Sequence, residues 1–356
     1  MTSSRATLVQ VAERAGVSLA STSRALHGTG ASPAMVERVR AAAEELGYRP
    51  HVTGRSLRMK RTFQVAFAVA DIGNPVYVEM LSAIHAVLSP HGYRVVVMST
   101  GDTVASTVDL VHSLEGGFVD GMIISPLRVD DAFVSAVEEA AVPVVVIGRS
   151  LADHGIDSVS TDSAGGIAQA VDHLVGVGRR RIGFLNGPLD TTPGEARQRG
   201  FDAATRATAF TAEDGGTEVA DDFTVTAGLA AAHRLLDRAH DAGTPLDAVV
   251  AANDLLAIGA IRAAGERGLS VPGDLAVTGM DDTDIGRVFQ PSLTSVSLGS
   301  GRRGRIAAEL VLGLVDDGEE RGRYVTVGPE LIVRESSVAA PTTAPAPRPA
   351  PRKEDA

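Results

Sequence analysis

The sequence predicts a small all-α headpiece of the helix-turn-helix type, followed by an α/β body of two doubly wound subdomains. One observation is that helix start and stop signals recur closely between Thr7 and Gly47. Another is that short apolar runs then alternate with helical patterns, which is typical of parallel sheets covered by helices. The chain has 356 residues. Because the body is longer than one ordinary domain, we expect it to divide in two.

Three short helices are expected in the headpiece. Thr7, with a glutamine three residues later, has the spacing of a capping box at a helix start. Gly16 lies where a helix end needs a residue that tolerates positive φ. Ser18 is a new N-cap, and the second helix is expected over residues 19–26. Pro33 marks the third start, since proline at the first helical position loses no hydrogen bond.

A helix-turn-helix fold places the start of its second helix in the major groove of DNA. The residues expected to cap that helix or to face the groove are Ser18, Leu19, Ala20, Ser21, Ser23 and Arg24. Arg24 can donate two hydrogen bonds to O6 and N7 of guanine, and Leu19 or Ala20 can contact a thymine methyl group. The alternative is a helical hairpin that packs on protein.

The distribution of charge favours DNA over protein as the partner. Residues 1–62 contain ten Lys and Arg against four Glu, a net charge of +6. The whole chain carries −11, so the remainder carries −17. A basic headpiece on an acidic body confines phosphate affinity to the headpiece.

The ordered motifs AxxAGVSxxSTSRxLxG, ELGYRP and GRSLR resemble the LacI/GalR family of bacterial transcription regulators, over residues 5 to about 338. The resemblance implies a hinge at 51–57, where the family motif is N-x-x-A-R-S-L. In the family this hinge forms a short helix on the operator, and its leucine wedges into the minor groove. The matching residues are Arg55, Ser56 and Leu57. His51 and Gly54 depart from the family's asparagine and alanine, and glycine disfavours a helix by about 1 kcal/mol.

The body contains apolar runs that are expected to form buried parallel strands. They cover residues 65–70, 95–98, 122–124, 144–147, 182–185, 248–251 and 275–278. Helical patterns lie between them, for example at 164–175 and 255–267. Doubly wound sheets bind ligands beyond the carboxyl ends of their strands, so polar residues there are candidates for an effector site.

The candidate effector-binding residues are Asn74, Tyr77, Arg149, Arg197, Phe223, Asn253 and Asp281. Planar donors and acceptors match vicinal hydroxyls, and an aromatic face covers the apolar side of a sugar ring. The resemblance implies ligand contacts at these motif positions. Taken singly, each has another reading: Asn74 and Asp281 are turn formers, Arg197 could form a surface ion pair, and Phe223 could be core.

The resemblance also implies the domain limits. Residues 1–50 are the headpiece, 51–62 the hinge, and 63–338 a periplasmic-binding-protein-like domain for effector binding and dimerisation. Its N-subdomain is expected at about 63–161 and 294–324, and its C-subdomain at about 162–293 and 325–338. The Pro/Ala-rich tail, 339–356, is expected to be disordered.

These features predict a cytoplasmic, homodimeric transcriptional regulator, which we expect to be a repressor. It should bind a palindromic double-stranded operator and respond to a small molecule. The expected effector is a sugar. We expect no catalysis, no cofactor and no metal. The alternatives are a purine or other non-sugar effector, a sugar transport protein and a sugar-acting enzyme. The absence of cysteine excludes disulfides and thiolate zinc sites. No signal-peptide core or membrane span is evident in the sequence.

Overall fold

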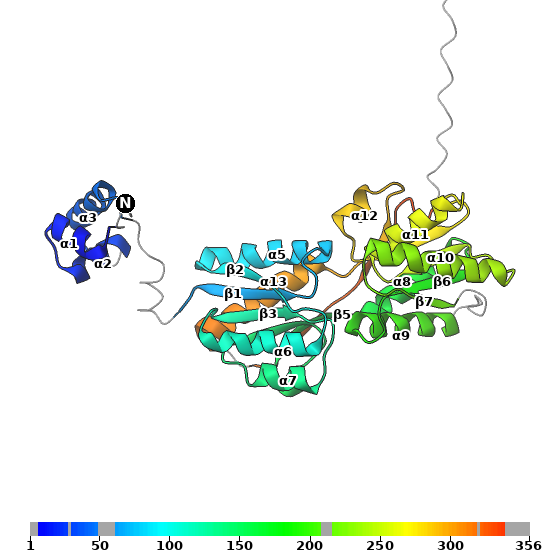
Figure 1. Ribbon diagram of the computed structural model, residues 1–356, viewed down its shortest axis with the longest axis horizontal. Coiled ribbons are helices and arrows are strands. Elements are labelled where there is room, and N and C mark those ends of the chain that lie inside the picture. The colour runs from blue at the N-terminus through cyan, green and yellow to red at the C-terminus, as the bar shows by residue number, and fades with distance from the viewer. Residues whose placement is uncertain (1–5, 28–29, 49–60, 208–215, 319–320, 339–356) are drawn as a thin grey trace, which may run out of the picture. The chain divides into compact units, whose positions relative to one another are not determined.

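The protein, seen in a computed structural model, divides into two compact units, Met1–Phe63 and Gln64–Ala356 (Figure 1). The structure describes residues 6–27, 30–48, 61–207, 216–318 and 321–338. Most of the predicted hinge and all of the predicted tail lie outside these residues. Each unit is described below by itself.

The described residues of the first unit contain three helices, as the sequence predicts: α1 (Leu8–Ala15), α2 (Leu19–His27) and α3 (Pro33–Glu45). The capping box at the start of α1 is present, with the backbone N–H of Thr7 donating to the side chain of Gln10 at 2.8 Å. Gly16 ends α1 with φ of 63°. This left-handed conformation is one that glycine adopts without steric cost. The small core consists of Val11, Ala15, Ala25, Val39, Ala42 and Ala43.

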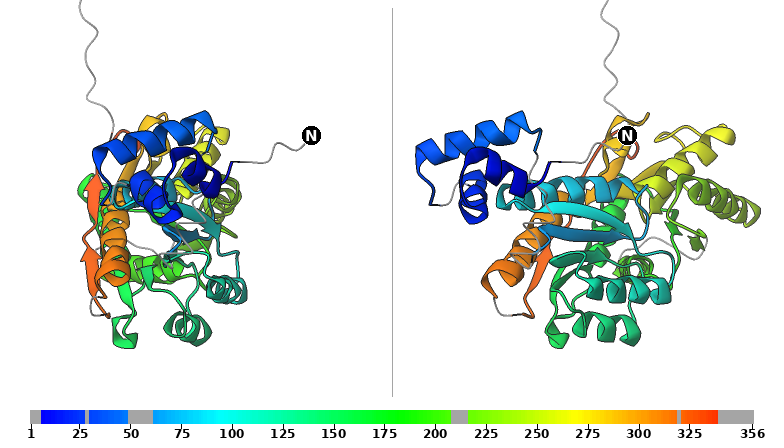
Figure 2. Two further views of the ribbon diagram at one scale, coloured as in Figure 1. Left: turned by 90° about the vertical axis from the view of Figure 1, so that its left-hand side faces the viewer. Right: turned by 60° about the vertical axis from the view of Figure 1, so that its left-hand side comes forward.

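The second unit contains two lobes, each built on a six-stranded sheet. The sheet of the N lobe has the order β11-β5-β4-β3-β1-β2, and its strand pairs are all parallel. Its strands are β1 (Gln64–Val69), β2 (Arg94–Ser99), β3 (Gly121–Ser125), β4 (Val144–Gly148), β5 (Asp157–Thr161) and β11 (Tyr324–Val327). Its helices are α5 (Pro75–Leu88), α6 (Val104–Ser113), α7 (Asp131–Glu138) and α13 (Ser300–Leu312). Helices cover both faces of this sheet (Figure 2).

The sheet of the C lobe has the order β12-β10-β9-β8-β6-β7, and among the strand pairs of its described residues only β10–β12 is antiparallel. Its strands are β6 (Ile182–Asn186), β7 (Thr217–Val219), β8 (Ala248–Ala251), β9 (Ala276–Met280), β10 (Thr294–Ser297) and β12 (Glu330–Ile332). Its helices are α8 (Ser163–Gly176), α9 (Thr192–Ala207), α10 (Val225–Asp241), α11 (Asp254–Glu266) and α12 (Asp284–Val288). Short helical turns occur at Ser89–His91, Leu114–Gly116, Ala152–His154 and Gly313–Asp317.

The chain crosses between the lobes after β5, after β10 and after β11. The first crossing is near Thr161, the end of β5. The other two follow Ser297 and Val327, because β10 pairs with β9 in the C lobe and β11 pairs with β5 in the N lobe. These crossings bring α13, which follows a C-lobe strand, into the N lobe beside α5.

Helices α13 and α5 approach each other closely. A Cβ atom at Gly304 would lie 2.7 Å from the backbone oxygen of Met80 on α5, so only glycine fits at this contact. The neighbouring residues Ala307, Ala308 and Val311 are buried on the same helix. This packing fixes the rotation of α13 and therefore decides which of its side chains turn towards the space between the lobes.

Candidate functional site

The start of α2 presents a polar and apolar surface of the kind expected to read bases. The side chain of Ser18 accepts a hydrogen bond from the backbone N–H of Ser21 at 3.1 Å and so caps the helix. Leu19 is 49% exposed, and Ala20 and Arg24 are exposed as well. The guanidinium of Arg24 lies 3.4 Å from the Ser21 hydroxyl. In the described headpiece these side chains are available to a partner.

Ser23 does not fit its predicted place on this surface. It is only 7% exposed and lies beside the fully buried Thr22 on the inner side of α2. The prediction of an exposed Ser23 was wrong because the helical repeat turns this position towards the three-helix core. The predicted hinge residues Arg55, Ser56 and Leu57, with His51 and Gly54, lie outside the described residues.

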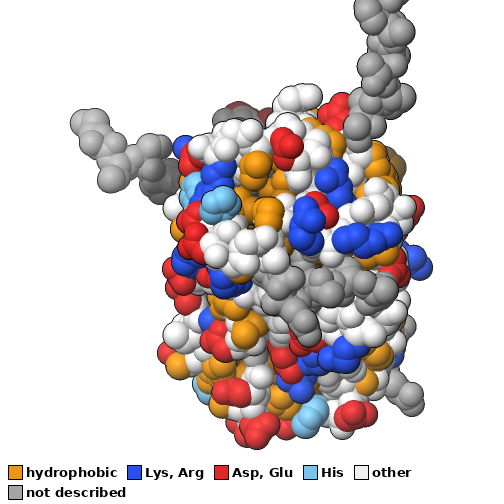
Figure 3. Space-filling model, turned by 90° about the vertical axis from the view of Figure 1, so that its right-hand side faces the viewer, with side chains coloured by type: hydrophobic (Ala, Val, Ile, Leu, Met, Phe, Trp, Pro, Cys, Tyr) orange, Lys and Arg blue, Asp and Glu red, His pale blue; other side chains and the backbone are white. Residues whose placement is uncertain are grey.

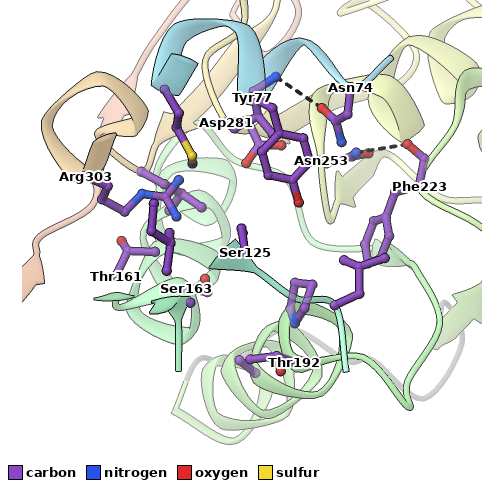
Figure 4. Close-up of a pocket in the computed structure, with 18 of the residues that line it drawn as sticks. Asn74, Tyr77, Ser125, Thr161, Ser163, Thr192, Phe223, Asn253, Asp281 and Arg303 are labelled. Carbon is purple, nitrogen blue, oxygen red and sulfur yellow. Dashed lines mark hydrogen bonds between the residues drawn. The ribbon is translucent and has the colours of Figure 1, made fainter. Parts of the chain in front are cut away.

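A cavity between the two lobes of the body is the second candidate site (Figure 4). The space it encloses is about 790 Å³, including solvent at its mouth. Its N-lobe wall is formed by Asn74, Val76, Tyr77, Met80, Ser125, Pro126, Leu127, Ile147, Gly148, Thr161 and Arg303. Its C-lobe wall and the crossings supply Ser163, Thr192, Pro193, Ala196, Arg197, Phe223, Asn253, Asp281 and Leu298. The cavity thus lies where the strands of both sheets end, as the fold class predicts.

Asn74 and Tyr77 supply polar groups to the N-lobe wall of the cavity. Asn74 follows β1 and caps α5, with its side-chain oxygen accepting from the backbone N–H of Val76 at 3.2 Å. The ring of Tyr77 packs edge-on against Phe67, with ring centroids 6.3 Å apart. Burial raises the pKa of Tyr77, and a hydrogen bond with Ser125 opposes this effect. The phenol is therefore a neutral group that can donate or accept a hydrogen bond.

Asn253 and Phe223 are joined on the C-lobe side. Asn253 caps α11 by accepting from the backbone N–H of Leu256 at 2.8 Å, and its amide nitrogen donates to the carbonyl oxygen of Phe223 at 3.1 Å. The guanidinium carbon of Arg197 lies 5.8 Å from the centre of the Phe223 ring, within the range of a cation–π contact. Each side chain is thus held before any ligand arrives.

Arg197 and Asp281 form a buried charged pair in the cavity wall. One nitrogen of Arg197 lies 3.6 Å from a carboxylate oxygen of Asp281, and the residues are only 6% and 7% exposed. Burial raises the pKa of Asp281, while Arg197 and then Arg303 lower it. Asp281 also has φ of 107°, a conformation that costs free energy in a residue other than glycine and is concentrated at functional sites.

The loop that carries Asp281 is held from behind by Asp254. The carboxylate of Asp254 accepts hydrogen bonds from the backbone N–H and the hydroxyl of Thr283, both at 2.7 Å, and from the hydroxyl of Ser295 at 2.5 Å. Burial, and next the charge of Asp281, raise the pKa of Asp254 to about 7. Asp254 therefore positions the loop without lining the cavity itself.

The structure brings six of the seven predicted effector residues together at this cavity and leaves one out. Arg149 is exposed and does not belong to the lining. Sequence reasoning also missed several polar lining residues. These are Ser125, Thr161, Ser163, Thr192 and Arg303. Arg303 lies one turn before the buried Ala307 on α13, but Arg302 and Arg305 on the same helix leave this register ambiguous in the sequence.

The lobes also contact each other at the mouth of the cavity. The backbone N–H of Thr192 donates to the carbonyl oxygen of Leu127 at 2.8 Å. The guanidinium of Arg128 pairs with the carboxylate of Asp190 at 2.7 Å and donates to the carbonyl oxygen of Asp102 at 2.8 Å. The Thr192–Leu127 and Arg128–Asp190 contacts join the two lobes, whereas the Arg128–Asp102 contact lies within the N lobe. Opening the cavity would break the first two, so they favour the closed arrangement.

The outer surface of the C lobe is different from the cavity. Basic and acidic side chains are interspersed over the face in Figure 3. Ion pairs of this lobe include Arg238 with Glu218 at 2.6 Å and Arg267 with Asp237 at 2.5 Å. In the described parts of the chain, no helix is long and apolar enough to cross a bilayer. There is also no cluster of His, Asp or Glu among those residues that could hold a metal ion.

Comparisons with known proteins match both units. Residues 7–51 match the family described as bacterial regulatory proteins, lacI family, and residues 171–337 match a periplasmic binding protein-like domain. The regulator CelR of Thermobifida fusca is 35% identical over 341 residues, covering 93% of this chain and 98% of that protein. Catabolite control protein A of Priestia megaterium is 30% identical, covering 82% of this chain and 86% of that protein.

Solved structures agree with these matches. A lac repressor dimer bound to operator and the anti-inducer ONPF is similar with a TM-score of 0.83 and 28% identity, covering 94% of this chain and 100% of that one. A complex of the regulator CelR with cellobiose is similar with a TM-score of 0.69 and 33% identity, covering 93% of this chain and 100% of that one. The headpiece and the two-lobed body therefore occur together in proteins of this architecture.

Proposed function

The chain belongs to the lacI family of bacterial regulatory proteins and is a DNA-binding transcriptional regulator with a small-molecule effector, and we propose that this effector is a sugar bound in the cavity between the lobes. Binding there changes the affinity of the headpiece for an operator. The protein binds its ligand without transforming it.

The observation that carries the proposal is the set of groups around the cavity. Asp281, Arg197 and Asn253 offer an acceptor and planar donors at fixed positions, which suits the vicinal hydroxyls of a sugar. Asn74 and Tyr77 offer polar atoms from the opposite wall. Phe223 supplies an aromatic face beside them, suited to the C–H side of a pyranose ring.

The similar proteins support the same ligand class. The CelR structure is a complex with cellobiose. The ribose operon repressor of Escherichia coli strain K12 is 28% identical over 337 residues, covering 93% of this chain and 100% of that protein. A sugar effector is therefore consistent with both the side chains that line the cavity and the ligands named for similar proteins.

For the DNA side, we propose a homodimeric repressor on a palindromic operator in the cytoplasm, where the chromosome is. Two headpieces on one dimer match a two-fold operator. The similar lac repressor structure is a dimer on its operator. Exposed apolar side chains of the body, Val78 at 58%, Ile285 at 42% and Val288 at 81%, are available for the dimer contact.

The experiment measures ligand and operator binding on the full chain. An operator is first selected from random palindromic DNA, and its affinity is followed by anisotropy of a labelled duplex while mono- and disaccharides, cellobiose and ribose among them, are added. We expect one of them to change operator affinity, and calorimetry to show its binding directly. Asp281→Ala should abolish both effects while operator binding without sugar persists.

Asp284→Ala is the matched control, because Asp284 is 95% exposed on the helix that follows the same loop. Its sugar response should equal that of the parent protein. An unchanged sugar affinity in Asp281→Ala would show that the cavity is not the effector site.

A further inference from the structure

Arg303 is a buried cation whose charge the protein leaves uncompensated at short range. It lies on α13, is 6% exposed and lines the cavity between the lobes. One terminal nitrogen donates to the hydroxyl of Ser300 at 3.3 Å, and the buried Nε has no hydrogen-bond partner. Among the described residues, no carboxylate lies within salt-bridge distance of it. Asp281 and the exposed Glu79 act on it only from farther away.

The other guanidinium of the cavity has a different environment. The Nε of Arg197 is likewise buried without a hydrogen-bond partner, but its guanidinium pairs with Asp281 at 3.6 Å and lies over the ring of Phe223. The lining therefore contains two guanidiniums and one carboxylate, a formal excess of one positive charge. Asp254 lies outside the lining, and its charge acts on Arg197 rather than on Arg303.

A second unsatisfied group lies on the same side as Arg303. The hydroxyl oxygen of Thr161, at the end of β5, is buried and has no hydrogen-bond partner. Figure 4 shows Arg303 with Thr161 and Ser163 below it, across the cavity from Phe223 and Asn253. A cation and a hydroxyl thus lie on one side of this view, Asn253 and Phe223 lie on the other, and Asp281 lies between them.

We propose that the effector is an acidic sugar, in which a carboxylate or phosphate group is bound by Arg303 and Thr161 while the hydroxyls contact Asp281, Arg197 and Asn253. This proposal rests on the proposed sugar function and specifies the ligand within it. The anion would supply the one negative charge that the lining lacks.

The energetic reason is the cost of burying an unpaired charge. Burial lowers the pKa of Arg303 to about 10, so the side chain remains a cation at neutral pH. A neutral sugar would displace water from this cation without supplying a negative charge to compensate it, which is unfavourable. A carboxylate or phosphate can accept short, charge-assisted hydrogen bonds from the guanidinium and a further one from a hydroxyl.

The test compares matched neutral and acidic sugars by calorimetry on the full chain, at constant ionic strength. Glucose is compared with each of three acidic derivatives, namely glucuronate, gluconate and glucose 6-phosphate. Cellobiose is compared with cellobionate. At least one acid should bind about tenfold or more tightly than its neutral partner, as one charge-assisted contact provides. A preference for phosphate over carboxylate, or the reverse, identifies the anion.

Two variants connect the preference to the residue. Arg303→Met keeps the length of the side chain and removes the charge, and it should reduce affinity for the preferred acid about tenfold or more while changing that of the neutral partner much less. Arg303→Lys should retain part of the preference. Arg302→Met is the matched control, because Arg302 is exposed and outside the lining, and it should bind like the parent protein.

The outcomes separate the two proposals. A neutral sugar that binds more tightly than every acid, with no effect of Arg303→Met, would overturn the acidic effector and leave the sugar regulator standing. An acid preference that survives Arg303→Met would also overturn it, since the anion would be bound elsewhere. Binding of no sugar, neutral or acidic, would overturn both.

Discussion

Replacing Asp254 with asparagine should remove a pH dependence from the stability of the body. Asp254 is 1% exposed, and burial and the charge of Asp281 raise its pKa from 3.8 to about 7. A carboxyl group whose pKa is higher in the folded than in the unfolded state contributes stability that is complete below the unfolded value and is lost as pH rises through the folded value. Between pH 5 and pH 8 this loss amounts to roughly 2–3 kcal/mol.

Asparagine can keep the local contacts. Its oxygen can accept from the backbone N–H and hydroxyl of Thr283, and its nitrogen can donate to the hydroxyl of Ser295, which would then accept. We therefore expect Asp254→Asn to resemble the parent protein near pH 5 and to be more stable near pH 8. The loop that carries Asp281 should keep its position.

The assay is urea unfolding, followed by far-UV circular dichroism at several values of pH between 5 and 8. The quantity compared is the difference in free energy of unfolding between the parent protein and Asp254→Asn, which cancels other titrations. Asp284→Asn, at a position 95% exposed, is the control and should parallel the parent protein. Curves for Asp254→Asn that also parallel the parent protein would show that Asp254 is ionised throughout this range, and the reasoning about its burial would be wrong.

The remaining predictions concern DNA. Arg24→Ala should weaken binding to the selected operator by roughly 1–3 kcal/mol and binding to random DNA much less, measured at one salt concentration. The control is Arg14→Ala, because the guanidinium of Arg14 is already paired with Glu45 at 2.6 Å, and this variant should not alter the ratio of operator affinity to random-DNA affinity. Equal losses on both DNAs for Arg24→Ala would mean that Arg24 contacts only phosphate. In the predicted hinge, Gly54→Ala should tighten operator binding by up to about 1 kcal/mol per hinge, because alanine favours the helix. Leu57→Ala should reduce the bend of the operator in a circular-permutation gel, and an unchanged bend would remove Leu57 from the wedge role.

Sequence reasoning predicted most of the buried parallel strands. Each of the seven apolar runs corresponds to a strand, for example β8 at Ala248–Ala251, because strands covered on both faces need continuous apolar side chains. The predicted burial of residues 95–98 was wrong, since β2 is an edge strand whose residues are half-buried or exposed. Strand β5 was missed because polar residues occupy its buried positions. Its Asp157 pairs with Arg323 at 2.6 Å, and Ser158 donates to the carbonyl oxygen of Ile156. The pattern of apolar residues does not predict these polar contacts.

The residues of the candidate site also divide into those that the sequence could predict and those that it could not. Asn74 and Asn253 could be predicted because each follows a strand and caps the next helix, a local signal. Arg303 could not, since α13 also contains Arg302 and Arg305, and only the packing of Gly304 against α5 decides which arginine turns inward. Ser23 was misplaced for a related reason, because its burial depends on the rotation of α2 against the headpiece core.

The position of Arg303 also connects the cavity to the part of the chain that leads to the headpiece. Arg303 is on α13, which packs directly on α5, and α5 begins after β1 at the Asn74 cap. Strand β1 starts at Gln64, immediately after the segment predicted to be the hinge. A ligand can shift the operator-binding equilibrium only through contacts that differ between two arrangements of the protein. A ligand bridging Asp281 in the C lobe and Arg303 in the N lobe has such contacts, because they can form together only in the closed arrangement that Arg128 and Asp190 also favour.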